Sequence, residues 1–293
     1  MKLNVILAIS LGAVLILLAY ANNVSLIKAA PSTADNKKEG FNVMLDNYSL
    51  PIVDYGYEEG IYIGPQRNPV TIAQNALNYY NYFKENSDDY SKRVFLNNSD
   101  WLVNNAVSHG NYSILEYKFP WPIYDLKPPW HSAMAQARAL QVLIRADKIT
   151  GTEIYLNTAK KILNSFFIEV KDGGVTYKTP TDGWWYELYA SNKGKESRVL
   201  NGMLFALVGI YQYYEYTQDF DAKYLFDQGV LALKKDLPRY DPMDGHSYYD
   251  IYRKPAPLLY HNIHVKYLGL LYNITKEEIF KEYHDKWENY KTS

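Results

Sequence analysis

The sequence of 293 residues contains no cysteine. Disulfide bonds, thiolate nucleophiles and cysteine-ligated metals are therefore excluded. A basic excess is also missing, since the net charge is −1 and the pI is near 6.6, so we expect no nucleic-acid partner. The chain has neither a glycine-rich phosphate loop nor a serine flanked by glycines. We therefore expect no nucleotide site of that type, and we predict no cofactor.

Aromatic residues are abundant instead. They make up 16% of the chain, and 30 of them are tyrosines. Tyrosine combines a flat apolar face with a hydroxyl group, which suits a polar, ring-shaped ligand such as a sugar. The same enrichment also suits ordinary helix packing, so composition alone leaves both interpretations open.

The N-terminus has the pattern of an export signal. Lys2 precedes a long apolar run, Leu3–Ala19, and the residues up to Ala21 have the small-x-small form of a signal-peptidase site. We predict that residues 1–21 are a signal peptide. The run is nearly long enough to span a bilayer, so an uncleaved membrane anchor is the alternative. Both versions place the protein outside the cytoplasm, secreted or anchored, and only this segment would contact a membrane.

Residues 22–40 are small, polar and charged, and they predict a flexible linker. After extended pieces between residues 41 and 64, apolar periodicity predicts about eight helices in four pairs. In pairs two to four the first helix tends to be apolar all round and its partner is amphipathic, as in an inner ring shielded by outer helices. The expected ranges are 70–85 with 94–107, 132–149 with 153–167, 198–216 with 220–237, and 258–272 with 276–290.

This pattern predicts a mainly α-helical fold, an α/α toroid, which is an incomplete α/α barrel of about four helical hairpins. A two-domain helical array fits the helix count too, but no Pro/Gly/Ser-rich linker divides residues 65–290. We therefore expect residues 41–293 to form a single α/α toroid catalytic domain.

Three aromatic connections separate the helix pairs: Tyr112–Trp130, Gly173–Tyr189 and Gly245–Tyr260. We expect each to contain a short β-hairpin and all three to lie at one end of the toroid. Their aromatic side chains would then line one cleft. These side chains are Tyr124, Trp130, Trp184, Tyr189, Tyr249 and Tyr260.

Ionisable residues accompany these aromatics and suggest further chemistry. Glu187 and Asp250 could form the carboxylate pair of a glycosidase, although sequence spacing does not establish their separation. His261 and His264 lie three apart on a predicted helix and could ligate a metal together with a carboxylate. Without a glutamate between them the metal signal is weak, and we predict no metal site.

Six ordered motifs resemble the C-terminal helical domain of the glucuronyl C5-epimerases that act on heparan-type chains. The resemblance spans about Gly64 to Tyr290. The β-barrel domain of that family has no counterpart here. The motifs are Trp130–Gln136, Trp185–Tyr189, Val199–Gly202, Leu237–Asp241, Tyr249–Asp250, and Tyr260–His261 with His264.

The resemblance implies inversion of D-glucuronate to L-iduronate at C5 within a polysaccharide, by removal and return of a proton. The family's catalytic tyrosines correspond to Tyr189, Tyr249 and Tyr260. The acidic residue that precedes the first of them in animal members is Leu188 here, and Glu187 is the candidate substitute. A buried phenol beside a cation can have a lowered pKa, which would suit proton exchange.

We predict that further residues of these motifs bind the substrate. Arg253 is the candidate clamp for the substrate carboxylate, because cations near that group stabilise the developing carbanion. The predicted substrate-binding residues are Trp130, Trp185, Arg198, Asn201, Arg253, His261 and His264.

The expected partner is a uronate-containing polysaccharide. A polysaccharide lyase is one alternative, because the same carbanion followed by loss of the C4 substituent gives elimination. A non-catalytic carbohydrate-binding relative is another. A homodimer is compatible with the sequence, which does not fix the oligomeric state.

Overall fold

The computed structural model describes residues 42–243 and 245–290. The predicted signal peptide or anchor (1–21) and the predicted linker (22–40) lie outside these ranges. Within them, no helix combines the length and the apolar character needed to cross a bilayer.

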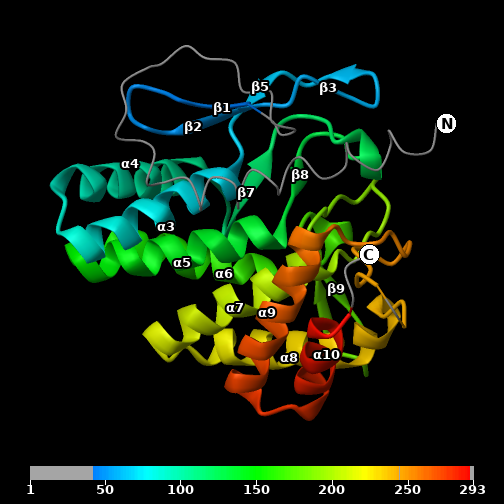
Figure 1. The fold of residues 1–293 in the computed structure, drawn as a ribbon. Coiled ribbons are helices and arrows are strands. Elements are labelled where there is room, and N and C mark those ends of the chain that lie inside the picture. Colours follow the sequence, from blue (N-terminus) through cyan, green and yellow to red (C-terminus); the bar gives the residue numbers. More distant parts are fainter. Residues whose placement is uncertain (1–41, 244, 291–293) are drawn as a thin grey trace.

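Eight α-helices dominate the described residues, and they form four consecutive hairpins, as the sequence predicts (Figure 1). The largest difference is in the second helix. It begins five residues earlier than expected, where Asp88 caps it by accepting a hydrogen bond from Ser91 N. The helices are α3 (Pro69–Asn86), α4 (Asp89–Asn105), α5 (Ala133–Thr150), α6 (Glu153–Asn164), α7 (Leu200–Thr217), α8 (Phe220–Asp236), α9 (Leu258–Thr275) and α10 (Glu278–Glu288).

The first helices of the four hairpins form an inner layer. Helix α5 packs between α3 and α7, and α7 packs in turn against α9, while α4, α6, α8 and α10 each pack against their hairpin partner. Helices α5 and α7 approach closely at Gly209, where an added Cβ would lie 2.6 Å from the carbonyl oxygen of Ala137. The helices thus form the predicted incomplete α/α toroid.

The last inner helix, α9, differs from the expectation of an all-apolar helix. It is buried at His261, His264 and Leu268, but Asn262 and Lys266 are exposed on its other side. The ring has four hairpins and α9 is its last inner member, so one side of this helix faces solvent.

Short strands supply the connections and the N-terminal part. Strands β1, β2 and β5 form one antiparallel sheet, and β3 and β4 form a separate hairpin. Strands β6, β7 and β8 connect α4 to α5, and β9 and β10 connect α6 to α7. The strands are β1 (Asn42–Leu45), β2 (Pro51–Asp54), β3 (Tyr57–Glu58), β4 (Ile61–Tyr62), β5 (Pro65–Gln66), β6 (Ala106–His109), β7 (Tyr112–Tyr117), β8 (Trp130–His131), β9 (Thr176–Lys178) and β10 (Trp184–Tyr186).

Two of the three predicted β connections are therefore present, and the third is not a hairpin. Among the residues described between α8 and α9, one isolated bridge is formed, from Tyr248 to Pro255. Pro242, Pro255 and Pro257 lack the N–H groups that a strand ladder requires. This connection is consequently a loop that hydrogen bonds back to its neighbours.

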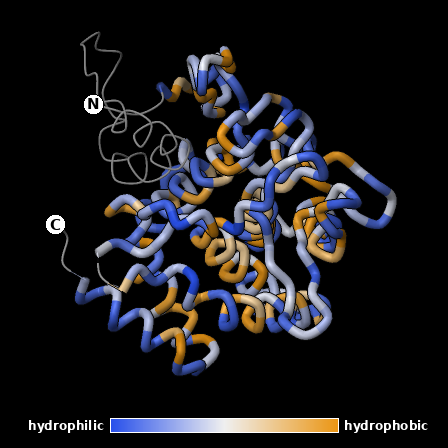
Figure 2. The backbone as a smooth tube through the Cα atoms, turned by 90° about the vertical axis from the view of Figure 1, so that its right-hand side faces the viewer, coloured by the Kyte–Doolittle hydropathy of each residue, from blue (hydrophilic) through white to orange (hydrophobic). Residues whose placement is uncertain are grey.

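The apolar side chains form two clusters. The larger one fills the space between the helix layers, and hydrophobic residues accordingly gather toward the middle of the molecule in Figure 2. The smaller one joins the N-terminal strands to β7, the segment after β10 and the start of α9. It lies at the end of the ring where α3 and α5 begin, and it contains most of the aromatic residues that the sequence assigns to a cleft.

Candidate active site

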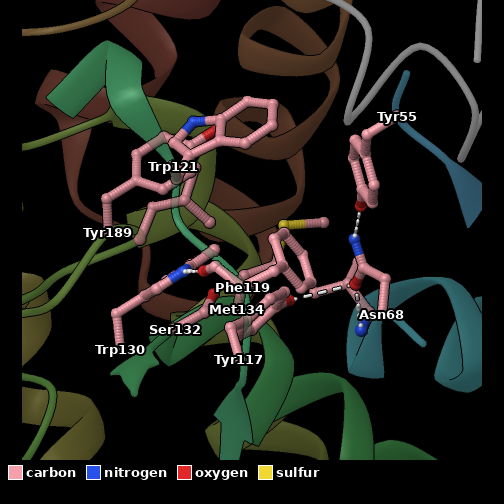
Figure 3. A pocket seen from close by; sticks show the side chains of 11 residues that line it. Tyr55, Asn68, Tyr117, Phe119, Trp121, Trp130, Ser132, Met134 and Tyr189 are labelled. Atoms are coloured by element: carbon pink, nitrogen blue, oxygen red, sulfur yellow. Dashed lines mark hydrogen bonds between the residues drawn. The ribbon is translucent and has the colours of Figure 1, made fainter. Parts of the chain in front are cut away.

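A pocket opens within the smaller cluster (Figure 3). Its empty space is about 380 Å³, including the part open to solvent. The walls come from the residues before α3, from β7 and the segment after it, from the start of α5, and from the segment after β10. The lining residues are Tyr55, Asn68, Val70, Tyr117, Phe119, Trp121, Trp130, Ser132, Met134, Leu188 and Tyr189.

Aromatic rings fix Tyr189 on one side of this pocket. Its ring stacks on Tyr124 with centroids 4.7 Å apart and lies parallel to Trp121 at 6.4 Å. The ring centroids of Trp130 and Tyr189 lie 5.8 Å apart. Trp130 donates its indole N–H to the carbonyl oxygen of Phe119 at 2.7 Å. The predicted site residues Tyr189 and Trp130 are thus both in the pocket wall and held rigidly there.

A polar network crosses the opposite side. Asn68 donates from its amide nitrogen to the Tyr55 hydroxyl at 2.6 Å, and its amide oxygen accepts from the Tyr117 hydroxyl at 3.1 Å. The same oxygen caps α3 by accepting from Val70 N at 2.8 Å. Ser132 caps α5 in the same way. The N-terminal ends of two long helices therefore meet the pocket, and their dipoles favour negative charge there.

The three predicted catalytic tyrosines lie next to one another. Tyr189 lines the pocket, and its hydroxyl is hydrogen bonded to the hydroxyl of Tyr249. The Tyr249 ring lies 5.2 Å from that of Tyr260. The Tyr260 hydroxyl is buried and has no hydrogen-bond partner within the described residues. The structure brings the three residues together on one side of the pocket, with Tyr189 in front.

The pKa values of these three tyrosines are raised, whereas the nearby cation expected from the sequence would lower them. Burial raises the pKa of Tyr189 to about 12, with Glu187 and Asp250 acting in the same direction, while the hydrogen bond from Tyr249 acts against it. Burial raises the pKa of Tyr249 and of Tyr260 well above the usual value. All three hydroxyls are therefore protonated at neutral pH.

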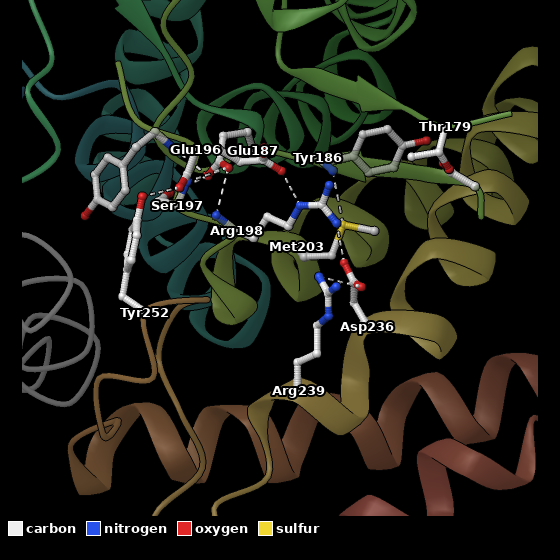
Figure 4. Close-up of polar contacts among 12 residues, drawn as sticks. Thr179, Tyr186, Glu187, Glu196, Ser197, Arg198, Met203, Asp236, Arg239 and Tyr252 are labelled. Atoms are coloured by element: carbon white, nitrogen blue, oxygen red, sulfur yellow. Dashed lines mark hydrogen bonds and ion pairs between the residues drawn. The ribbon is translucent and has the colours of Figure 1, made fainter. Parts of the chain in front are cut away.

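Glu187, two residues before Tyr189 in the chain, is fully buried and takes part in the polar network of Figure 4. Its carboxylate accepts from Tyr189 N at 3.2 Å, Ser197 Oγ at 2.7 Å, Ser197 N at 3.3 Å and Arg198 N at 2.8 Å. Burial raises its pKa, and these hydrogen bonds oppose that shift. This residue ties together the two ends of the segment between β10 and α7.

Trp185 and Arg198 belong to a second cluster, outside the set that lines the pocket. The Arg198 guanidinium lies 5.8 Å from the Trp185 ring and pairs with Glu196 and Asp236 (Figure 4). Trp185 also stacks on Tyr240 at 6.0 Å. Both predicted substrate-binding residues are thus engaged with protein groups.

The loop between α8 and α9 carries Asp250 and Arg253. The Asp250 carboxylate is buried, accepts from the Tyr124 hydroxyl at 2.8 Å and lies 3.7 Å from Lys254 Nζ. Arg253 is exposed and has a φ of 58°. Asp250 therefore holds the loop against Tyr124, and the candidate clamp Arg253 lies on the loop surface.

The two predicted histidines are held by Ser247. His261 Nδ1 accepts from Ser247 N at 3.0 Å, so its Nε2 donates to the carbonyl oxygen of Trp287 at 3.0 Å. His264 Nδ1 lies 2.8 Å from Ser247 Oγ, and burial lowers the pKa of His264 to about 3. The described part of the chain contains no group of three or more His, Cys, Asp or Glu side chains arranged for a metal.

Two more residues of the predicted cleft lie elsewhere. Asn201 is fully buried at the start of α7, and neither atom of its amide has a hydrogen-bond partner among the described residues. Trp184, which the sequence places in the cleft, packs instead against Phe167 and Tyr224 of the outer part of the fold.

Comparison with known proteins gives the family. Residues 108–289 match the family described as "D-glucuronyl C5-epimerase C-terminus". The chain belongs to this family. A D-glucuronyl C5-epimerase of Caenorhabditis elegans is 32% identical over 284 residues, which are 90% of this chain and 43% of that protein. The chain thus spans less than half of the length of that relative. An uncharacterized protein of Methanocaldococcus jannaschii is 33% identical over 263 residues, with 83% of each chain covered.

Solved structures share the fold at low sequence identity. A D-mannose isomerase superposes with a TM-score of 0.54 and 13% identity, covering 93% of this chain and 69% of that one. An unsaturated glucuronyl hydrolase from a Bacillus species superposes with a TM-score of 0.51 and 14% identity, covering 75% of this chain and 60% of that one. A cellobiose 2-epimerase from Bacillus thermoamylovorans superposes with a TM-score of 0.50 and 16% identity, covering 72% of this chain and 55% of that one. The helical toroid is thus a fold that this chain shares with these three proteins.

The polar residues of the second pocket wall are absent from the sequence prediction. Tyr55, Asn68 and Tyr117 lie in short extended pieces or just before a helix, where neither periodicity nor a motif marks them. One local signal exists at Asn68, because Asn followed by Pro69 is typical of a helix N-terminus. That signal places the residue at a helix start but does not show that this start faces a pocket.

Proposed function

We propose that the protein is a polysaccharide uronate C5-epimerase that inverts D-glucuronate to L-iduronate by removing and returning the C5 proton. The observation that carries the proposal is the position of Tyr189, a pocket residue within the stretch that matches the epimerase family and one that the sequence resemblance assigns as a catalytic tyrosine. Aromatic walls suit a sugar ring. The helix ends at Asn68 and Ser132 favour the negative charge of a uronate carboxylate and of the carbanion next to it.

In this mechanism Tyr189 serves as the acid. Its hydroxyl is protonated at neutral pH, so it donates a proton to one face of C5. The phenolate that remains is stabilised by the hydrogen bond from Tyr249. Tyr260 packs against the ring of Tyr249, which donates this hydrogen bond.

The test is incubation with uronate polymers in heavy water. We expect deuterium at C5, both epimers from either starting polymer, and no chain shortening. Chain cleavage with ultraviolet absorbance from unsaturated uronate would instead assign a lyase. Glycan binding without exchange would assign a binding protein, and either outcome would overturn the proposed epimerisation.

We also propose that the protein acts outside the cytoplasm, because the N-terminal apolar run is followed by a signal-peptidase motif. Mass spectrometry of the mature protein should find Asn22 as the first residue. An intact Met1–Ala21 segment would replace secretion with anchoring.

A further inference from the structure

Helix α5 presents two arginines on the inner side of the helical ring. Between Ala133 and Ala146 every residue is buried except Arg138 and Arg145. The two lie on the same face of the helix, about two turns or about 10 Å from one another along its axis. Gln141 lies between them on that face. Solvent therefore reaches this part of α5 along one line of side chains, the arginine stripe (Arg138, Gln141 and Arg145).

Arg138 contacts the last two inner helices. Its guanidinium lies 4.4 Å from the ring centroid of Phe205 in α7. It is also hydrogen bonded to the Tyr267 hydroxyl of α9 and donates to Gln141 Oε1 at 2.9 Å. Its Nε–H has no acceptor among the described residues. The side chain thus reaches from α5 toward α7 and α9.

Arg145 contacts the first and third inner helices. Its guanidinium lies 5.6 Å from the ring centroid of Tyr80 in α3 and donates to Gln212 Oε1 in α7 at 3.2 Å. It also donates to the main-chain oxygen of Gln141 at 2.7 Å. The two arginines together contact α3, α7 and α9, so both face the inside of the incomplete ring. The ring has no helix between α3 and α9 among the described residues, which explains why neither arginine is buried.

The two guanidinium groups have only neutral partners within the part of the chain that the structure describes. Arg198, by contrast, pairs with the carboxylates of Glu196 and Asp236. Burial lowers the pKa of Arg145, and the charge of Arg138 acts in the same direction, so the two cations repel each other. Two unpaired cations on one helix face oppose folding. Groups that break such rules are most often found at functional sites.

The arginine stripe continues from the pocket. Met134 lines the pocket and lies on the same face of α5, about 6 Å along the axis before Arg138. A polymer with one sugar in the pocket can therefore extend over the stripe.

The stripe has the chemistry of an oxyanion site. A guanidinium group forms paired, charge-assisted hydrogen bonds with such anions. Arg145 uses two of its N–H groups in the bonds described above, and others remain for a ligand. The half-buried rings of Tyr80 and Tyr267 beside the arginines suit the apolar face of a sugar. This combination fits an acidic saccharide better than a free inorganic ion.

We infer that the arginine stripe binds an acidic group of the polysaccharide, a carboxylate or a sulfate ester, on a sugar beyond the one held in the pocket. The inference rests on the proposed function, because it takes an acidic polysaccharide as the substrate. The stripe contributes affinity and the register of the polymer, and it takes no part in the proton transfer.

The first experiment measures binding of an unsulfated glucuronate polymer by calorimetry. We expect Arg145→Gln to raise the dissociation constant about 10-fold or more, the usual effect of losing a hydrogen bond to a charged group. Arg138→Lys keeps the charge but loses the planar fork, and it should weaken binding as well. The control Arg93→Gln removes the same charge from an exposed position on α4 and should bind as the wild type does. Wild-type affinity in both stripe variants would overturn the inference.

The second experiment identifies the source of the anion from the thermal unfolding of the wild type and of Arg145→Gln. The glucuronate polymer and a sulfated polymer should each raise the wild-type Tm more than that of the variant. The same glucuronate polymer with its carboxyl groups reduced to alcohols should show no such difference. A difference of equal size with inorganic sulfate alone would assign the stripe to a free anion and would overturn the polysaccharide assignment.

Kinetics separate this inference from the proposed function. In an active wild-type background, Arg145→Gln should raise KM for the polymer and leave kcat unchanged, because the stripe contacts no reacting group. A lower kcat with an unchanged KM would indicate a structural role and would overturn the inference. Weaker binding by Arg145→Gln, together with a wild type that shows no C5 exchange, would refute the proposed function and support the anion site.

Discussion

Glu58 in the β3–β4 hairpin is buried, and its Oε2 atom has no hydrogen-bond partner among the described residues. Removing its charge should therefore stabilise the protein, by an amount that grows as the pH rises from about 4.5 to 7. The pKa of this carboxyl is about 7 in the folded protein, against 4.5 for an unperturbed glutamate. Because the folded value is the higher one, the stability associated with the protonated group is present below pH 4.5 and is lost as the pH rises through 7. A difference of about 2.5 units corresponds to about 3 kcal/mol at 1.36 kcal/mol per unit.

Glu58→Gln stays neutral at every pH and therefore avoids this loss. We expect the difference in unfolding free energy between the variant and the wild type to rise by about 3 kcal/mol between pH 4 and pH 8. The buried amide of glutamine has its own desolvation cost, but that cost is independent of pH. The change with pH, rather than the value at one pH, is consequently the decisive quantity.

Urea unfolding at pH 4, 5.5, 7 and 8 measures this difference. Glu282→Gln on the exposed side of α10 is the control, and we expect it to stay within about 0.5 kcal/mol of the wild type. A difference for Glu58→Gln that does not change with pH would mean that the carboxyl is solvated or paired in solution. The reasoning from burial would then be refuted.

Three further changes test the supporting framework. Tyr249→Phe should lower C5 exchange, read by deuterium incorporation, at least about 100-fold with little loss of stability. The substitution removes only the hydrogen bond to the Tyr189 phenolate. Exchange at the wild-type rate would exclude a role for this hydrogen bond. Glu187→Ala should lower the unfolding free energy, measured in urea, by about 3–5 kcal/mol, because four donors lose their acceptor. The control Glu196→Ala, at a more exposed ion pair, should lower it by about 1 kcal/mol or less. Gly209→Ala should cost about 1–3 kcal/mol in the same assay, because its Cβ meets the backbone of Ala137; an unchanged midpoint would mean that α5 and α7 separate easily.

The sequence predicts the helices well because their signal is local. Apolar residues at helical spacing identify all eight helices, and most ends agree within a few residues. The start of α4 was missed because residues 89–93 are mostly polar, and only the cap at Asp88 marks it. The hairpin expected between α8 and α9 is wrong, because prolines interrupt the strand ladder. Both differences arise where a few backbone hydrogen bonds outweigh the apolar pattern.

The site is predicted only in part, for a physical reason. Trp130 and Tyr189 could be assigned from motifs, and both line the pocket. Tyr55 could not, because it is positioned by the pairing of β2 with β5, a long-range event that no spacing reports. Asn68 has a local capping signal, but this signal does not show that the start of α3 faces a pocket. Three of the four donors to Glu187 are backbone N–H groups of its own loop, and these leave no trace in the identity of residues.

The two walls of the pocket have different origins, and this affects how function is transferred to the chain. Tyr189 and the residues behind it lie within the stretch that matches the epimerase family, 108–289. Tyr55 follows β2 and Asn68 precedes α3, so both lie before this stretch. The family match therefore covers the tyrosine wall of the pocket but not the wall that Tyr55 and Asn68 form. A function transferred from the family rests on the first wall, and the second wall has to be tested in this chain itself.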